Sequence, residues 1–463
     1  MTDTISTDPA DAAPAAPSGA RSRPRRRSPS DLPFRFADRA LAEQLAAERE
    51  EPQWLAAERL AALAGFESLP IEPNQLYTPY VDLRSADLLA ARPYVLDGPA
   101  GLGDDLAALR APDAPGLPDG VVVETMSEWL ERDPAGFRSA LDGAPTLPVA
   151  DKLAQLARGF WSHGRHVEIA DGLALATPIV LRWPGSAPGR ALITRTLITL
   201  GAGASASIVE ELVPCGPVIE CAEGETVPQG LFHGTTEVVL GAGASLAMAS
   251  IQELGPGQVA FQHRHAAIGE AAALHWALAQ LGGRLVRSRV DNRLEGDRSS
   301  VEQVEIVFAA EDQLFDLTSY TRHLGRDTTG NLLSKGVLLD RSRSFMKGLI
   351  TIEKSAIGTD SFLGEFGMNL SKAARAVAIP SLEIDQPDCR RAAHSSSVGP
   401  IDPTQLFYLE SRGISTDDAR KFVVLGFLEP VVAAVPLDDA RDRLRELLEE
   451  KWAAGLRESA TAA

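Results

Sequence analysis

A single histidine, His394, lies in a run of small residues just ahead of two expected helices. The run reads AAHSSSVGPIDP and occupies positions 392–403. Alanine and serine leave room for another backbone or a ligand to approach closely, and an imidazole can bind a metal through one nitrogen near neutral pH. A core histidine packed beside a turn is the alternative, and composition alone favours that alternative.

Four of the other seven histidines occur in two short pairs. His263 and His265 form an HxH motif, which in a strand places both rings on one face, where they could hold a metal. His163 and His166 are three apart and could do the same on a helix. Neither pair has a cysteine or carboxylate at a ligand spacing, so the sequence favours surface or core histidines.

Four acidic residues, Glu302, Glu305, Asp312 and Asp316, raise the possibility of a polysaccharide lyase or hydrolase. Such enzymes need two carboxylates on opposite sides of one glycosidic bond. The offsets between these four do not place them on one strand face. Solvated strand faces and turns are therefore the favoured interpretation, and a carbohydrate-active β-helix enzyme is the alternative.

Motifs for nucleotide and cluster binding are missing from the sequence. Gly201 and Gly203 lack the third glycine of a dinucleotide loop, and no GxxxxGK[ST] segment occurs, so we expect a tight turn and no ATP site. The three cysteines, Cys215, Cys221 and Cys389, form no CxxC pair. An iron–sulfur cluster held by four cysteines of this chain is thus impossible.

The bulk composition limits the class of protein. The chain has 463 residues and a formal net charge of −18, which disfavours binding to nucleic acid. No apolar run is long enough to cross a membrane, and the N-terminus lacks the apolar segment of a signal peptide. We therefore expect a cytoplasmic protein that binds neither membranes nor nucleic acid.

Composition divides the chain into segments. Residues 1–30 are rich in Ala, Pro and Ser and then basic, which predicts a disordered tail, and residues 31–160 form a helical and mixed domain. Over 161–398, short Val/Ile/Leu-rich runs alternate with turns, and LGAGAS occurs at 200–205 and again at 240–245. Repeated short strands predict a parallel β-helix, with a jelly roll or sandwich as the alternative.

Residues 399–463 return to helical patterns. Asp402 followed by proline is typical of a helix start, Gly413 of a helix end, and Ser415 of the next start. The last segment carries one apolar stripe. Its members are Leu437, Ala440, Leu444, Leu447, Leu448 and Trp452.

The segment AHSSSVGPIDPTQLFYLESRGIS, followed by DDARKFVVLGFLEPVV, resembles the C-terminal signature of the SufB/SufD family of iron–sulfur cluster assembly proteins. Upstream, NLSKAARAVAIPSLEI resembles another segment of that family. WLAAERLAALAGFESLP and NQLYTPYVDLR are similar to the N-terminal region of the SufD branch. The strong similarity covers about 315–432, and the chain is identified as a member on the SufD side.

The resemblance implies a right-handed parallel β-helix flanked by helical regions. It also implies a non-catalytic scaffold subunit that pairs with a SufB-like protein through the last β-helix strands. A SufC-like ATPase would dock on the C-terminal helices, here about 403–456. The partner-binding residues expected there are Leu406, Phe407, Tyr408, Arg412 and Phe427.

The resemblance also assigns a role to His394. The matching histidine lies at the SufB–SufD junction, where it helps to hold a transient iron–sulfur cluster shared with SufB. Many relatives carry a cysteine two residues earlier, where this chain has Ala392, so Cys389 is the remaining thiolate candidate. An association with reduced flavin is implied without a sequence motif. A purely structural SufD-like subunit that has lost the ligand role is a further alternative.

Overall fold

The structure is a computed structural model of the chain. It describes residues 28–99, 102, 107–109, 117–143, 147–216 and 227–461. Cys221 and residues 1–27 of the predicted disordered tail lie outside the described residues.

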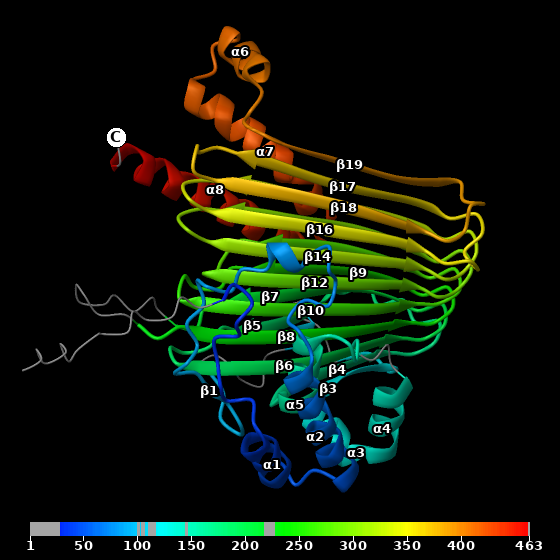
Figure 1. Ribbon diagram of the computed structural model, residues 1–463. Coiled ribbons are helices and arrows are strands. Elements are labelled where there is room, and N and C mark those ends of the chain that lie inside the picture. Colours follow the sequence, from blue (N-terminus) through cyan, green and yellow to red (C-terminus); the bar gives the residue numbers. More distant parts are fainter. Residues whose placement is uncertain are drawn as a thin grey trace, which may run out of the picture.

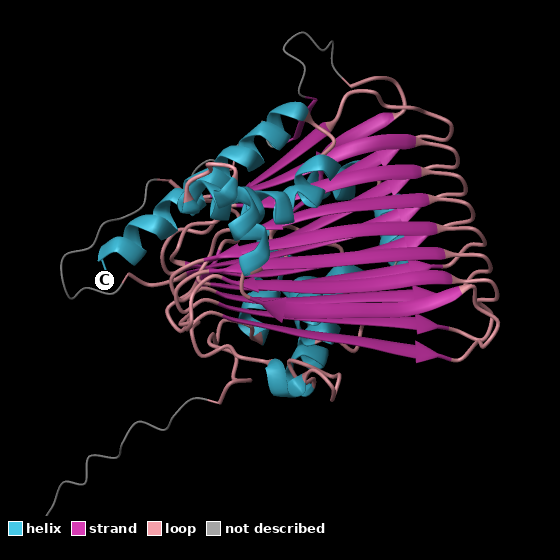
Figure 2. Cartoon of the chain, turned by 90° about the horizontal axis from the view of Figure 1, so that it is seen from above, coloured by secondary structure: helices cyan, strands magenta, loops and turns pink. Residues whose placement is uncertain are grey.

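Two facing parallel sheets form the body of the protein (Figures 1 and 2). The even-numbered strands from β4 to β18 form one sheet, here called sheet A. The odd-numbered strands from β5 to β19 form the other, sheet B. The chain therefore alternates between the sheets, one strand in each per coil, as in a parallel β-solenoid. The strands are β4 (His163–Ile169), β5 (Ile179–Pro184), β6 (Arg190–Leu200), β7 (Ser205–Val213), β8 (Gly230–Leu240), β9 (Ser245–Gln252), β10 (Gln258–Ile268), β11 (Ala273–Gln280), β12 (Leu285–Leu294), β13 (Ser300–Ala309), β14 (Leu314–His323), β15 (Thr329–Leu338), β16 (Arg343–Ile352), β17 (Asp360–Asn369), β18 (Arg375–Ile384) and β19 (Arg391–Gly399).

The predicted parallel β-helix is confirmed, and the jelly roll and sandwich are excluded because β4 to β19 pair in parallel. The two LGAGAS repeats form stacked turns between the sheets. Gly203 and Gly243 adopt φ of +67° and +68°, a backbone region open to glycine at no steric cost. The Gly203 N–H donates to Ala242 O at 2.8 Å, so each turn bonds to the next coil.

Helices and short strands cover the first coils, at the bottom of Figure 1. Phe160 and Trp161 are buried in the core shared by these helices and sheet A. Burial of such large aromatic side chains is a main source of stability at this junction. The elements are α1 (Arg39–Glu48), α2 (Gln53–Ser68), β1 (Arg92–Pro93), β2 (Ala107–Leu109), β3 (Val121–Thr125), α3 (Met126–Arg132), α4 (Pro134–Gly143) and α5 (Lys152–Phe160).

A connecting segment, residues 70–91, runs up the outer face of sheet A and includes the short helix η1 (Thr78–Tyr80) (Figure 1). Ion pairs fix it to the sheet: Arg287 Nη2 lies 2.6 Å from Glu72 Oε2, and Arg343 Nη1 lies 2.9 Å from Asp82 Oδ2. Burial opposes ionisation of Asp82, but hydrogen bonds from Arg84 and Arg343 lower its pKa to about 2. The segment is thus held by charges over the whole neutral pH range.

The C-terminal helices are α6 (Pro403–Ser411), α7 (Thr416–Ala434) and α8 (Asp438–Thr461). Asp402 and Ser415 are the expected N-caps of α6 and α7, and Gly413 adopts φ of +85° between the two helices. Leu444 and Trp452 of the predicted stripe are buried in the core that α8 shares with sheet B. Within the described residues, no helix is long and apolar enough to cross a membrane.

Lys451 ties α8 to the ends of two coils. Its ammonium donates to Leu281 O and to Gln313 Oε1, and burial lowers its pKa from 10.5 to about 7. Between pH 7 and 10 the unfolded chain holds this proton and the folded chain does not, so folding stability rises with pH.

We therefore expect the free energy of unfolding of the wild type to increase by up to about 1.4 kcal/mol per pH unit relative to Lys451→Met over this range. Urea unfolding at pH 7, 8, 9 and 10, followed by circular dichroism, measures the difference. Parallel curves for the two proteins would contradict the prediction.

Candidate functional site

At one end of the solenoid no further coil follows the last strands in the described part of the chain. Strand β18 is the last strand of sheet A and β19 the last strand of sheet B, at the top of Figure 1. One edge of each strand pairs with no further strand in the described part of the chain. An exposed edge of this kind offers unpaired N–H and C=O groups to another protein.

His394 lies on β19 and faces the interior of the solenoid. It pairs with Leu363 of β17, which is fully buried, and directly paired residues of parallel strands point to the same side. No coil covers it, so the imidazole is exposed. His394 belongs to the last strand, because this polar run pairs in register with β17.

The interior layer of the open end is mostly apolar. Its exposed members include Ile384, at 46% of full exposure, and Val398, at 41%. Aliphatic side chains left this open normally mark a contact surface. The lumen-facing residues are Ala376, Ala378, Pro380, Leu382 and Ile384 from β18, and Ala392, His394, Ser396 and Val398 from β19.

Cys389 lies at the same end. It is a free thiol that packs against the small apolar cluster containing Leu382 and Ala392. Within the described residues, no three His, Cys, Asp or Glu side chains come together as a metal site. His394 and Cys389 alone are thus fewer donors than the four that an iron–sulfur cluster normally takes.

The predicted partner-binding residues divide into two groups. Phe407 and Tyr408 of α6 are 70% and 59% exposed, and Arg412 lies over the Tyr408 ring at 5.3 Å. Leu406 and Phe427 instead pack against the core between the helices and sheet B. The residues of the first group are the more exposed.

The histidine pairs are structural. His263 and His265 are buried, and His263 Nε2 lies 2.9 Å from Asp291 Oδ2. His163 and His166 lie in β4 and not on a helix, so their odd spacing sends the two rings to opposite faces. The helix arrangement considered for them is wrong, because this segment is the first strand of the solenoid.

The four acidic residues that an enzyme would need do not converge. Glu302 is exposed and Glu305 is buried, because they lie on opposite faces of β13. Asp312 is in a turn. Asp316 pairs with Arg287 at 3.0 Å under the segment that crosses sheet A. This arrangement offers no acid and base on either side of one bond.

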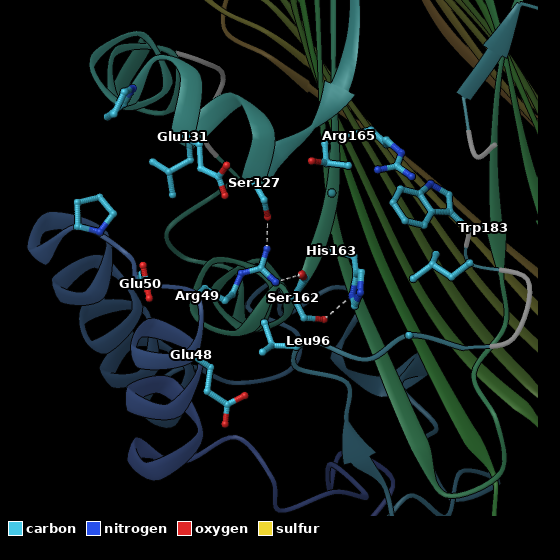
Figure 3. A pocket seen from close by; sticks show the side chains of 17 residues that line it. Glu48, Arg49, Glu50, Leu96, Ser127, Glu131, Ser162, His163, Arg165 and Trp183 are labelled. Atoms are coloured by element: carbon cyan, nitrogen blue, oxygen red, sulfur yellow. Dashed lines mark hydrogen bonds between the residues drawn. The ribbon is translucent and has the colours of Figure 1, made fainter. Parts of the chain in front are cut away.

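A cavity of about 900 Å³ lies between α1, α3 and the first coil (Figure 3). Arg49 crosses it and donates to Ser127 Oγ and Ser162 O, while His163 Nδ1 lies 2.9 Å from Ser162 Oγ. Burial and the charge of Arg49 lower the pKa of His163 to about 4. The inner polar groups thus bind one another and hold the helices on the solenoid.

Comparison with known proteins identifies the fold and its role. Residues 184–427 match the family described as SUF system FeS cluster assembly, SufBD core domain. This match covers more than half of the chain. The chain belongs to the SufBD family.

The relatives of this SufBD chain agree. It is 28% identical to the iron–sulfur cluster assembly protein SufD of Bacillus subtilis over 303 residues, which cover 65% of the chain and 67% of the relative. It is 31% identical to a SufBD family protein of Mycobacterium tuberculosis over 250 residues, covering 52% and 62%. The matches thus span about two thirds of the relatives' own lengths. The chain is a SufD-like member of a family that acts in iron–sulfur cluster assembly.

Two residues of this SufD-like chain were not identified from the sequence. Phe422 of α7 is 57% exposed beside Tyr408, and both line a groove of about 940 Å³ between α6, α7 and the ends of β17 and β19. Glu365 of β17 is buried in the lumen under β19. The sequence could have identified Glu365 by its position: it comes two residues after Leu363, on the apolar face of a strand in which inward and outward residues alternate.

Proposed function

We propose that this SufD-like chain is a non-catalytic scaffold subunit of a complex with a SufB-like and a SufC-like protein. A transient iron–sulfur cluster, the cargo of the complex, is assembled at the junction with the SufB-like partner. The observation that carries the proposal is the uncovered end of the solenoid, where His394 faces the lumen of an edge strand.

The SufB-like partner pairs with β18 and β19. A second solenoid end continues the two sheets by adding strands to their edges, which satisfies the free backbone groups and covers the apolar layer. The same contact brings the partner's ligands to His394, whose imidazole binds iron through one nitrogen. Cys389 packs against the same buried cluster as Ala392 of β19 and is a second ligand candidate.

The SufC-like ATPase docks on α6 and α7. Their exposed aromatic residues, Phe407, Tyr408 and Phe422, are typical of the anchors that dominate protein interfaces. Nucleotide chemistry comes from that partner because this sequence has no phosphate-binding loop. A carbohydrate-active enzyme is not favoured, since Glu302, Glu305 and the other acidic candidates do not converge.

Co-expression with SufB-like and SufC-like proteins of the same source tests the proposal. Size-exclusion chromatography should give one ternary complex, and iron and sulfide analysis should show both elements after anaerobic assembly. Absorbance of the same complex with reduced flavin tests the flavin association. Failure of the chain to associate with either partner would overturn the scaffold function.

A negative charge introduced on the exposed surface of α6 should selectively weaken binding of the SufC-like ATPase. We expect Phe407→Asp to weaken binding of the SufC-like protein by about tenfold or more, because it deletes an aromatic anchor. Binding of the SufB-like protein should be unchanged. Leu89→Asp is the matched control: Leu89 is 55% exposed but lies on the segment that crosses sheet A. Equal binding of the SufC-like protein by both variants would contradict the prediction.

A further inference from the structure

Glu365 occupies a place in the lumen that the fold keeps free for it. Its side chain is 1% exposed, and its Oε2 accepts a hydrogen bond from the Ile379 N–H of β18 at 2.7 Å. A Cβ atom added to Gly348 of β16 would lie 2.5 Å from Leu363 Cδ2 and 2.9 Å from Glu365 Oε1. The glycine therefore makes room for both side chains where the carboxyl group reaches across from sheet B to sheet A.

No basic side chain pairs with Glu365 in the described part of the chain. The ammonium group of Lys347, the next residue to Gly348, pairs instead with Asp316 on the outer side of sheet A. Two other lumen carboxylates differ in this respect: Glu210 is paired with Arg264 at 2.7 Å, whereas Glu305 of β13 accepts hydrogen bonds from the uncharged Ser288 and Gln280. Burial raises the pKa of Glu365 to about 8, against the opposing effects of the Ile379 N–H and of Lys347.

An unpaired buried carboxyl group is costly and needs a reason other than stability. A hydrophobic residue would fill the same volume at lower cost, as Leu363 does two positions earlier on the same side of β17. Glu365 differs from Glu305 in its place on β17, one coil below the open end, where a partner chain would close the lumen.

The position of Glu365 points to the partner. It pairs directly with Ser396 of β19, and His394 lies two residues before Ser396 on the same lumen-facing side. Diagonal neighbours on adjacent strands are roughly 7–8 Å apart, within reach of long side chains. Ser396 is small, and no further coil lies above it. A carboxylate and an imidazole together suit ferrous iron.

We propose that Glu365 is an iron-binding residue of the assembly site, one layer deeper in the lumen than His394. This inference rests on the proposed function, because a partner must close the open end. An incoming ferrous ion forms a bond to a carboxylate oxygen of Glu365, and the acid proton leaves to solvent. Iron keeps its oxidation state, so no oxidant or reductant is needed.

The experiment uses the complete complex with Glu365→Gln, which preserves shape and can still accept the Ile379 N–H bond. Glu383→Gln is the matched control: Glu383 lies on β18 at the same open end, but it is exposed and accepts a hydrogen bond from Thr351 on the outer side. Ferrous ion is titrated anaerobically into the purified complex, and bound iron and released protons are measured.

We expect Glu365→Gln to weaken ferrous binding by about tenfold or more, as loss of a metal-site group does, and to abolish one released proton. Complex formation should be unchanged, and Glu383→Gln should bind like the wild type. If Glu365→Gln binds iron and releases protons as the wild type does, the inference is overturned. The scaffold function would still be supported if the complex forms and His394→Ala loses iron. Absence of any complex would overturn both.

Discussion

Replacement of His394 by alanine is expected to lower the iron and sulfide content of the assembled complex by at least about tenfold, the effect of removing a group from a metal site. The imidazole is exposed on β19 and faces the lumen at the open end, where we propose that the SufB-like partner joins. On this proposal, the variant leaves the cargo cluster with one ligand fewer. Iron and sulfide analysis after anaerobic reconstitution measures the effect.

Complex formation should survive this substitution. His394 contributes one side chain to a layer that is otherwise apolar, and the backbone edge of β19 is unaltered. Ser396→Ala, on the same lumen-facing side, is the control and should retain the wild-type iron and sulfide content. Full cluster content in His394→Ala would instead favour the purely structural SufD-like subunit.

The second large effect concerns stability. Arg195 of β6 and Glu237 of β8 form an ion pair of 2.7 Å between sheet A and the N-terminal helices, with side chains 1% and 0% exposed. Glu237→Ala would leave the arginine charge buried without its partner. Removal of one member of such a pair typically costs about 3–5 kcal/mol. We expect a loss of this size in the free energy of unfolding, measured by urea unfolding.

A double variant separates the charge effect from the loss of packing. Arg195→Met with Glu237→Leu replaces both charges by apolar groups of similar size, which is often neutral or stabilising. Its unfolding midpoint should therefore return close to that of the wild type. A single variant as stable as the wild type would show that water or another group compensates the arginine.

Local pattern predicted much of the fold. The LGAGAS repeats predicted stacked turns because glycine adopts positive φ readily, and Asp402, Gly413 and Ser415 marked helix ends through local hydrogen bonds. The strand assignment was less certain where polar residues interrupted it. His163 and His166 were considered on a helix although they lie in β4, because pairing with a distant coil is not encoded locally.

The sequence by itself determined the parallel β-solenoid, its helical flanks and the SufBD signature around His394, since each follows from residues close together in the chain. Only the tertiary structure decided which side of β19 His394 faces, because that depends on its pairing with Leu363. It also decided which aromatic residues stay exposed and placed Glu365 beneath the open end. These are properties of contacts between coils about thirty residues apart, where burial and register set the environment of each side chain.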